Sequence, residues 1–243
     1  MITNRLATLT QKAMCGSATL FAAKQHGDAI LDRLKAKASP PGTFSQHGED
    51  VITCDLLKDY LSNGFFVDIG ANHPTKLSNT YRLYTLGMRG VTVEPNYAFC
   101  RLHQRYRPGD VCVCAGMGSA EGVACFLERG YHGLSSFLES SGLEAGFGSV
   151  VVARRLVPII TLAGLLRTLH LGGRTEFCLL SVDCEGFDAE VLQGNDWATF
   201  RPRYLIVEFN SAAAQRTLLD YLEGVGYRLQ RLLGCNMLFG RVE

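Results

Sequence analysis

From about residue 43 onward, continuous apolar segments alternate with stretches whose apolar positions recur at helical spacing. The apolar segments are rich in β-branched and aromatic residues and predict strands at 64–69, 90–94, 110–115, 177–183 and 203–209. The helical spacing predicts helices at 77–86, 97–106, 162–169 and 189–192. Strands that are apolar throughout and alternate with helices are typical of a parallel sheet covered on both faces. We therefore expect one α/β domain over residues 43–243.

The last part of the chain predicts a different arrangement of strands. A helix at 215–223 precedes strands at 227–233 and 236–240, which Gly234 and Cys235 join as a hairpin. A terminal hairpin on a parallel sheet indicates that the final strand is antiparallel. Further strands at 123–127 and 150–160 flank a Gly- and Ser-rich excursion at 129–149, which we expect to be a mobile loop.

Residues 1–42 are predicted to form an N-terminal extension. The pattern indicates one or two helices, ended by Ser39-Pro40-Pro41-Gly42, where proline and glycine disfavour helix. Thr, Gln, Ser and Gly interrupt the apolar residues, so the extension lacks the continuous apolar stretch of an export signal or a membrane span. We expect a cytoplasmic protein without stable membrane insertion.

Composition narrows the class of partner. The chain has 243 residues, 47% of them hydrophobic, which is enough for one substantial core. Lys and Arg number 24 against 23 for Asp and Glu, so no strong field attracts nucleic acid or an anionic membrane. The nine cysteines lack C-x-x-C spacing and are expected to be reduced thiols. We therefore expect a small-molecule or carbohydrate partner, and the oligomeric state stays open.

Candidate cofactor residues follow the first two predicted strands. Asp68 and Gly70 end the first strand, and Glu94 ends the second, 24 residues after Gly70. In doubly wound sheets, ligands bind beyond the carboxyl ends of the strands. Gly70 would let the backbone approach a ligand, Asp68 could bind a cationic amino group, and Glu94 is placed to bind ribose hydroxyls. The alternative is a structural glycine turn in which Asp68 caps the next helix.

The residues after Gly70 discriminate between nucleoside cofactors. A dinucleotide requires the spacing G-x-G-x-x-G, so that glycines admit the pyrophosphate over a helix N-terminus. Here Asn72 occupies the second glycine position, and His73 and the conformationally restricted Pro74 follow it. This arrangement favours S-adenosylmethionine (SAM), which has no phosphate, over NAD(P).

Five segments, in order along the chain, resemble the FkbM-type methyltransferases. They are 44–50 (FSQHGED), 64–84 (GFFVDIGANHPTKLSNTYRLY), 90–96 (GVTVEPN), 180–195 (LSVDCEGFDAEVLQGN) and 201–210 (RPRYLIVEFN). The resemblance implies a Rossmann-like class I methyltransferase fold, with a mostly parallel seven-stranded sheet whose last strand is antiparallel. It also implies SAM as the methyl donor and, usually, O-methylation of a sugar or secondary metabolite.

The resemblance also assigns roles to cofactor residues. It makes Asp68, Gly70 and Asn72 the first SAM loop and Glu94 the ribose ligand, in agreement with the interpretation from the residues alone. Ala115 and Gly116 occupy the place where such folds meet the adenine ring. The sequence departs from many relatives there, because 114–118 contains more glycine and no acid, and again at residue 163, where alanine replaces a common acid.

Asp183 and Glu185 are the leading candidates for acceptor chemistry. They follow the fourth strand of the predicted parallel sheet and would lie at the rim beside the cofactor, which Asp183 would also contact. Methyl transfer aligns nucleophile, methyl and sulfur, and an alcohol must also lose its proton to a base. The alternative is that both acids bind loop amides and cap the next helix.

Secondary candidates lie on neighbouring segments. His73 follows the SAM loop and is a further catalytic candidate, while His132, Ser135 and Glu208 are candidates for binding the substrate. No His and acid spacing requires a metal, so none is expected.

The 44–50 segment has two interpretations. Gln46, Glu49 and Asp50 could lie over the cofactor, or Ser45 with Asp50 could simply start a helix.

The sequence therefore predicts a SAM-dependent O-methyltransferase. An NAD(P)-dependent oxidoreductase on the same sheet is the enzymatic alternative, and a catalytically silent SAM-binding partner protein is the non-enzyme alternative. DNA methylation is not expected, because the chain has no Asp/Asn-Pro-Pro-Tyr sequence.

Overall fold

The computed structural model describes residues 42–129, 135–137, 150–169, 173 and 175–242. The predicted helices of the N-terminal extension lie outside these residues. The chain divides into two compact units, and the described parts of 39–124 and 157–243 belong to the larger one. The smaller unit includes the described parts of 125–156.

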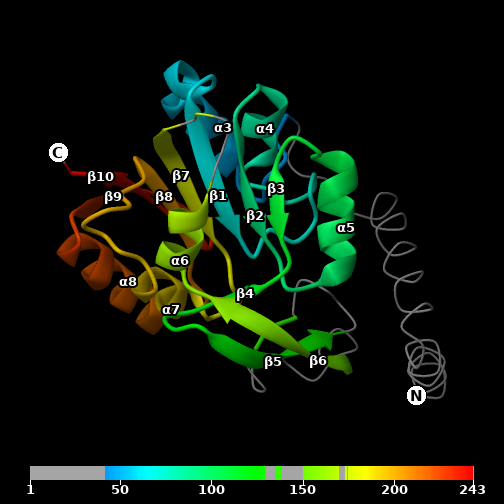
Figure 1. The fold of residues 1–243 in the computed structure, drawn as a ribbon. Coiled ribbons are helices and arrows are strands. Elements are labelled where there is room, and N and C mark those ends of the chain that lie inside the picture. The colour runs from blue at the N-terminus through cyan, green and yellow to red at the C-terminus, as the bar shows by residue number, and fades with distance from the viewer. Residues whose placement is uncertain (1–41, 130–134, 138–149, 170–172, 174, 243) are drawn as a thin grey trace, which may run out of the picture. The chain divides into compact units, whose positions relative to one another are not determined.

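A seven-stranded sheet forms the centre of the larger unit (Figure 1). In spatial order its strands are β3 (Val111–Val113), β2 (Arg89–Val93), β1 (Gly64–Ile69), β7 (Glu176–Val182), β8 (Tyr204–Glu208), β10 (Asn236–Arg241) and β9 (Tyr227–Leu233). The pairs from β3 to β8 are parallel, whereas β10 is antiparallel to both of its neighbours. The predicted class I methyltransferase topology is confirmed.

The strand order places a site at one edge of this sheet. The chain passes from β1 outward to β2 and β3 and then returns to β7 on the other side of β1. The order therefore reverses between β1 and β7. In open α/β sheets, ligands bind beyond the carboxyl ends of the strands at such a switch point.

Three of the described helices begin where a polar side chain accepts a first-turn amide. The described helices of the larger unit are α3 (Glu49–Leu56), the short 3-10 helix η1 (Lys58–Tyr60), α4 (Tyr81–Thr85), α5 (Tyr97–Tyr106), α6 (Leu162–Thr168), α7 (Asp188–Gln193) and α8 (Ala212–Gly224). Asn96, Thr161 and Ser211 cap α5, α6 and α8 through side-chain oxygens that accept first-turn amides. No helix in the described part of the chain is both long and apolar enough to cross a membrane.

Alternation along the strands gives the sheet two apolar faces. On one face, strand residues pack with side chains of α6, α7 and α8, including Val67, Ile69, Leu180, Val182, Leu165, Leu192 and Leu222. On the other face, residues near and within α3 and α4 pack with the sheet, including Phe66, Leu179, Ile206, Leu238, Leu57 and Leu83. Asp68, two residues after Phe66 on β1, lies on the second face.

Two parts of the larger unit differ from the prediction. The helix predicted at 77–86 begins only at Tyr81, because Leu77 has a φ of 50° and the Ser78 hydroxyl accepts the Tyr81 amide. A right-handed helix requires negative φ, so residue 77 cannot belong to it. Helix α3 corresponds to the helix start considered at Ser45 and Asp50, and the structure adds a two-residue strand, β4 (Gly116–Met117).

Strands β5 (Gly122–Arg129) and β6 (Val151–Ile160) correspond to the two predicted around the excursion. A three-stranded sheet has the order β4-β6-β5, with β4 parallel to β6. Within the smaller unit, Leu127 bridges to Ser136, and Glu128 forms an ion pair with Arg155. Most of the predicted mobile loop at 129–149 lies outside the described residues.

Candidate active site

Gly70 forms the turn at the end of β1. Its φ is 74°, and its amide and that of Ala71 both donate to the Val93 carbonyl of β2, at 3.0 and 3.1 Å. A Cβ atom at residue 70 would lie 1.8 Å from the carbonyl oxygen of Asp183, directly after β7. Only glycine allows this backbone conformation and this approach. The glycine turn therefore allows the backbone after β1 to lie against the backbone after β7, at the switch point.

Glu94 lies beside this turn and is only 6% exposed. Its Oε2 accepts the Asn72 amide at 2.9 Å, and its Oε1 accepts the Asn96 amide at 2.7 Å. Burial raises the pKa of Glu94 to about 7. A carboxylate has about four acceptor positions. Each oxygen therefore keeps capacity for a further donor, such as one of two adjacent hydroxyls.

Asp68 is already engaged by protein groups. The Thr80 hydroxyl donates to its Oδ2 at 2.6 Å. Burial raises the pKa of Asp68, and the charge of Arg107 opposes that effect. Asp68 thus connects β1 to the residue before α4. Its predicted contact with a cofactor amino group stays a prediction.

Ala115 and Gly116 follow β3 at the same edge of the sheet. The Ala115 side chain is 3% exposed and belongs to the apolar core, and Gly116 pairs with Ile159. A ligand at this position would therefore meet mainly backbone. Neither residue has a polar side chain, and the predicted adenine contact stays a prediction.

Three carboxyl groups gather at the ends of β7 and β8. Asp183, Glu185 and Glu208 each place one oxygen within 4.8 Å of the others. The carboxyl groups of Asp183 and Glu208 are hydrogen-bonded, which requires a shared proton. Burial, followed by the charge of Glu208, raises the pKa of Asp183 well above its ordinary value. The structure thus brings a predicted catalytic residue against a predicted substrate-binding residue.

Asp188, the first residue of α7, binds the backbone of this loop. Its carboxylate accepts the amides of Cys184 and Gly186 at 3.0 and 3.2 Å. Glu185 has a φ of 52°, and burial, then the charge of Asp183, raises its pKa to about 8. The loop amides considered for Asp183 and Glu185 are therefore bound by Asp188, and no side chain caps α7.

The three gathered oxygens are also of the type that Mg²⁺ or Ca²⁺ prefers. A cation would have to displace the proton shared by Asp183 and Glu208. Acidic groups commonly gather without an ion, so the geometry alone assigns no metal.

His73 lies in the turn after Asn72 and is 7% exposed. Its Nδ1 accepts the amides of Thr75 and Lys76 at 3.2 and 3.3 Å. In the neutral ring, the proton then resides on Nε2. A general base needs a free lone pair, and Nδ1 is already used as an acceptor. The catalytic role of His73 stays a prediction.

Two substrate-binding candidates do not belong to the described part of the larger unit. His132 lies outside the described residues. Ser135 belongs to the smaller unit, where its hydroxyl accepts the Arg129 amide at 3.0 Å.

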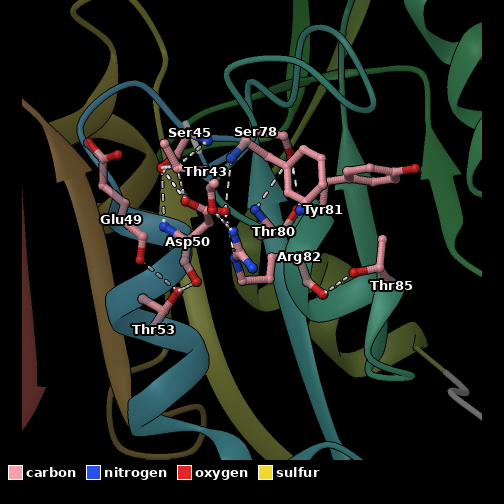
Figure 2. A network of polar contacts seen from close by, with 12 residues as sticks. Thr43, Ser45, Glu49, Asp50, Thr53, Ser78, Thr80, Tyr81, Arg82 and Thr85 are labelled. Atoms are coloured by element: carbon pink, nitrogen blue, oxygen red, sulfur yellow. Dashed lines mark hydrogen bonds and ion pairs between the residues drawn. The ribbon is translucent and has the colours of Figure 1, made fainter. Parts of the chain in front are cut away.

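Asp50 organises the 44–50 segment (Figure 2). Its carboxylate accepts the Phe44 amide at 2.9 Å, the Ser45 hydroxyl at 2.7 Å and Arg82 Nε at 2.9 Å, and the Thr43 hydroxyl donates to it as well. The Asp50 amide donates to the Ser45 hydroxyl at 3.2 Å. Asp50 thus joins the start of α3 to α4, in keeping with the interpretation of this segment as a helix start.

Glu49, the neighbouring residue, points away from the Asp50 network (Figure 2). It is fully buried and accepts the His47 amide at 2.8 Å and Asn236 Nδ2 at 2.7 Å. Asn236 pairs in register with Glu208. Glu49 therefore connects the 44–50 segment to the strand beside the carboxyl pair.

The sequence analysis missed two residues that support the site. Asn236 binds Glu49, and His103 Nε2 lies 3.0 Å from the Asn72 carbonyl oxygen. Both occur inside predicted elements, where the local sequence gave no sign of a contact with a distant segment. A histidine one turn after Cys100 on a predicted helix was the only available signal for the second.

Comparison with known proteins identifies one family. The chain matches the Methyltransferase FkbM domain over residues 68–229. No curated protein matches it in sequence.

Solved structures of similar fold are distant in sequence. An FkbM methyltransferase from Methylobacillus flagellatus has 14% identity and a TM-score of 0.48, over 98% of this chain and 59% of that one. A TehB-like SAM-dependent methyltransferase from Corynebacterium glutamicum has 10% identity and a TM-score of 0.46, over 90% and 99%. A protein described as an RNA methyltransferase from Pyrococcus horikoshii has 9% identity and a TM-score of 0.43, over 81% and 83%.

Proposed function

Because the chain belongs to the FkbM methyltransferase family, we propose that it transfers the methyl group of SAM to a hydroxyl of a sugar or secondary metabolite. The observation that carries this proposal is the position of two groups at one switch point. Glu94 offers a carboxylate for ribose beside the Gly70 turn, and the Asp183–Glu208 pair offers a proton acceptor after β7 and β8.

The Asn72 amide favours SAM over a dinucleotide. In a pyrophosphate site, free backbone amides of this turn point at the phosphates. Here the Asn72 amide donates to Glu94, and Asn72 carries a side chain where the dinucleotide spacing has glycine. A buried carboxylate at this position would also repel a phosphate. These contacts support a ribose-binding role for Glu94 and oppose the oxidoreductase alternative.

The proposed reaction requires alignment and one proton transfer. Bound SAM supplies a methyl group on a sulfonium, whose S–C bond breaks as the O–C bond to the acceptor forms. A hydrogen-bonded carboxyl pair holds one proton and has one carboxylate that can accept the proton of the acceptor hydroxyl. Asp183 holds the proton, because its pKa is raised well above the ordinary value, so Glu208 is the free carboxylate. Burial also raises the pKa of Glu208, which makes it a stronger base than an ordinary glutamate. Turnover is therefore expected to fall as the pH is lowered through the pKa of Glu208, where the pair takes up a second proton.

Glu185 is suited to a different task. With a pKa of about 8, it is protonated at neutral pH and can donate a hydrogen bond to the acceptor. Burying carboxyl groups destabilises a protein, so their concentration at this rim favours an enzyme over a silent SAM-binding protein. The same acidic groups disfavour a phosphate-rich acceptor such as RNA.

The test combines cofactor binding with methyl transfer. Calorimetry with S-adenosylhomocysteine measures binding, and labelled SAM measures transfer to a panel of sugars, hydroxylated metabolites, DNA and RNA. Asp183→Asn and Glu208→Gln should keep the affinity and lose about 10²- to 10⁴-fold in turnover. Glu223→Gln, an exposed change on α8, is the matched control.

Each outcome tests a separate part of the proposal. Absence of binding by the parent protein would refute SAM as the cofactor. Preferential transfer to nucleic acid would refute the acceptor class. Near-parental turnover in both site variants would exclude the carboxyl pair as the base.

A further inference from the structure

Helix α5 carries a buried histidine that the proposed reaction does not use. His103 is 1% exposed, and its Nε2 lies 3.0 Å from the Asn72 carbonyl oxygen. A carbonyl oxygen only accepts hydrogen bonds, so Nε2 must carry the proton. Burial, reinforced by the charge of Arg107, lowers the pKa of His103 to about 3. His103 is therefore a neutral donor throughout the physiological pH range.

The peptide groups of Asn72 are held from two sides. The amide donates to Glu94 Oε2 at 2.9 Å, and the carbonyl accepts from His103. Asn72 has a φ of 45°, a left-handed conformation that is uncommon for residues other than glycine. Asparagine adopts this conformation more readily than most residues, and the two hydrogen bonds hold its backbone from both sides.

The same helix contacts Glu94 directly. Cys100, one turn before His103, donates its thiol to the Glu94 carbonyl at 3.1 Å. Asn96, which caps α5, donates its amide to Glu94 Oε1. Residues three positions apart lie on one face of a helix. One face and the capping residue of α5 therefore support both ends of the Asn72–Glu94 contact.

We propose that His103 is a positioning residue of the cofactor site. His103 holds the Asn72 backbone through its carbonyl group, and the Asn72 amide in turn fixes the Glu94 carboxylate for the ribose hydroxyls. This inference rests on the proposed function, which makes Glu94 the ribose ligand. His103 acts through Asn72 and touches neither the acceptor nor the transferred methyl group.

Two substitutions at residue 103 separate hydrogen bonding from packing. His103→Gln retains an amide nitrogen that can reach the Asn72 carbonyl, whereas His103→Leu fills space without a donor. Gln104→Ala, at an exposed position of the same helix, is the control. The ligand-free proteins are compared by hydrogen exchange at the Asn72 amide and by melting temperature. Binding of S-adenosylhomocysteine and the KM and kcat for SAM are then measured.

The expected pattern is specific to positioning. His103→Leu should lose protection of the Asn72 amide and bind S-adenosylhomocysteine about tenfold more weakly, which is the scale of one lost hydrogen bond. Its KM for SAM should rise while kcat at saturating SAM stays close to that of the parent. His103→Gln should restore both protection and affinity, and Gln104→Ala should change neither.

Several outcomes would overturn the inference. Parental affinity in His103→Leu would show that the contact does not position Glu94. Equal losses in His103→Gln and His103→Leu, together with a lower melting temperature, would indicate packing alone. If the parent protein binds no S-adenosylhomocysteine, the proposed function fails and the positioning role fails with it. Exchange at the Asn72 amide would then still report whether His103 holds that peptide.

Discussion

At the scale of single residues, Glu94 shows how a carboxylate can be fixed before any ligand binds. Two backbone amides, of Asn72 and Asn96, donate to its two oxygens at 2.9 and 2.7 Å. The side chain would therefore need little further ordering to bind the proposed ribose, and preorganisation of this kind favours affinity.

Glu94→Gln is expected to weaken the binding of S-adenosylhomocysteine by about 10- to 100-fold, the scale of lost hydrogen bonds to a charged group. The amide nitrogen of glutamine would face either the Asn72 or the Asn96 amide, and two donors repel each other. Calorimetry checks the affinity, with Glu223→Gln as the exposed control. Unchanged affinity would place the cofactor elsewhere.

At the scale of elements, the Asp50 network joins α3 to α4 (Figure 2). Asp50 is fully buried, and Arg82 contributes a partly exposed guanidinium to it. Burial raises the pKa of Asp50, but hydrogen bonds from Thr43, Phe44, Ser45 and Arg82 outweigh burial, so the net pKa is lowered. The stabilisation is therefore present above the unfolded pKa and is lost as the pH falls through the folded value.

Asp50→Ala should lower the free energy of unfolding by about 2–4 kcal/mol, because it leaves several buried donors without an acceptor. Asp55→Ala, on the same helix, is the control: Asp55 is 83% exposed and lies 3.9 Å from Lys58. Its effect should stay within about 0.5 kcal/mol. Urea denaturation measures both variants, and similar effects would show that the network contributes little.

The junction of β1 and β7 is a second test at this scale. Gly70→Ala would place a methyl group 1.8 Å from the Asp183 carbonyl oxygen at a residue whose φ is 74°. Because backbone would have to move, we expect a loss of more than about 3 kcal/mol in stability, with loss of cofactor binding. Gly224→Ala, where a Cβ meets nothing within 4 Å, should be neutral or stabilising. Equal stability of the two variants would contradict the close approach of the strands.

At the scale of the larger unit, the buried acids make stability depend on pH. The folded pKa is raised to about 7 for Glu94 and Asp188 and to about 8 for Glu185. In each case burial is the first cause. The folded protein therefore retains protons that the unfolded chain has already lost, and stability falls as the pH rises through these values. His103, whose folded pKa is about 3, affects stability only below its unfolded value of about 6.5.

The melting temperature without ligand should accordingly be lower at pH 8.5 than at pH 6.5. This window contains the raised pKa values of about 7 and about 8. It also lies above the range in which His103 affects stability. Scanning calorimetry at constant ionic strength measures the difference. Glu185→Gln removes one of the groups and should reduce the slope. A melting temperature that increases across this window would contradict the raised pKa values.

The sequence by itself determined the elements and the edge of the sheet at which the proposed cofactor residues meet. The predicted bounds of β1, β9 and α5 agree with the structure, because apolar periodicity is a local property. Asp68, Gly70 and Glu94 follow neighbouring parallel strands, so the topology alone brings them to one edge.

Only the tertiary structure decided which side chains touch. Asp183 pairs with Glu208, Asn72 with His103, and Glu49 with Asn236 across 187 residues. It also shortened the helix predicted at 77–86, where Ser78 donates its amide to the Phe44 carbonyl. Such contacts depend on strand register, backbone torsions and side-chain rotamers that neighbouring residues in the sequence do not fix. The periodicity of the chain therefore places the polar groups at the sheet edge, whereas packing between distant segments selects their partners and raises their pKa values.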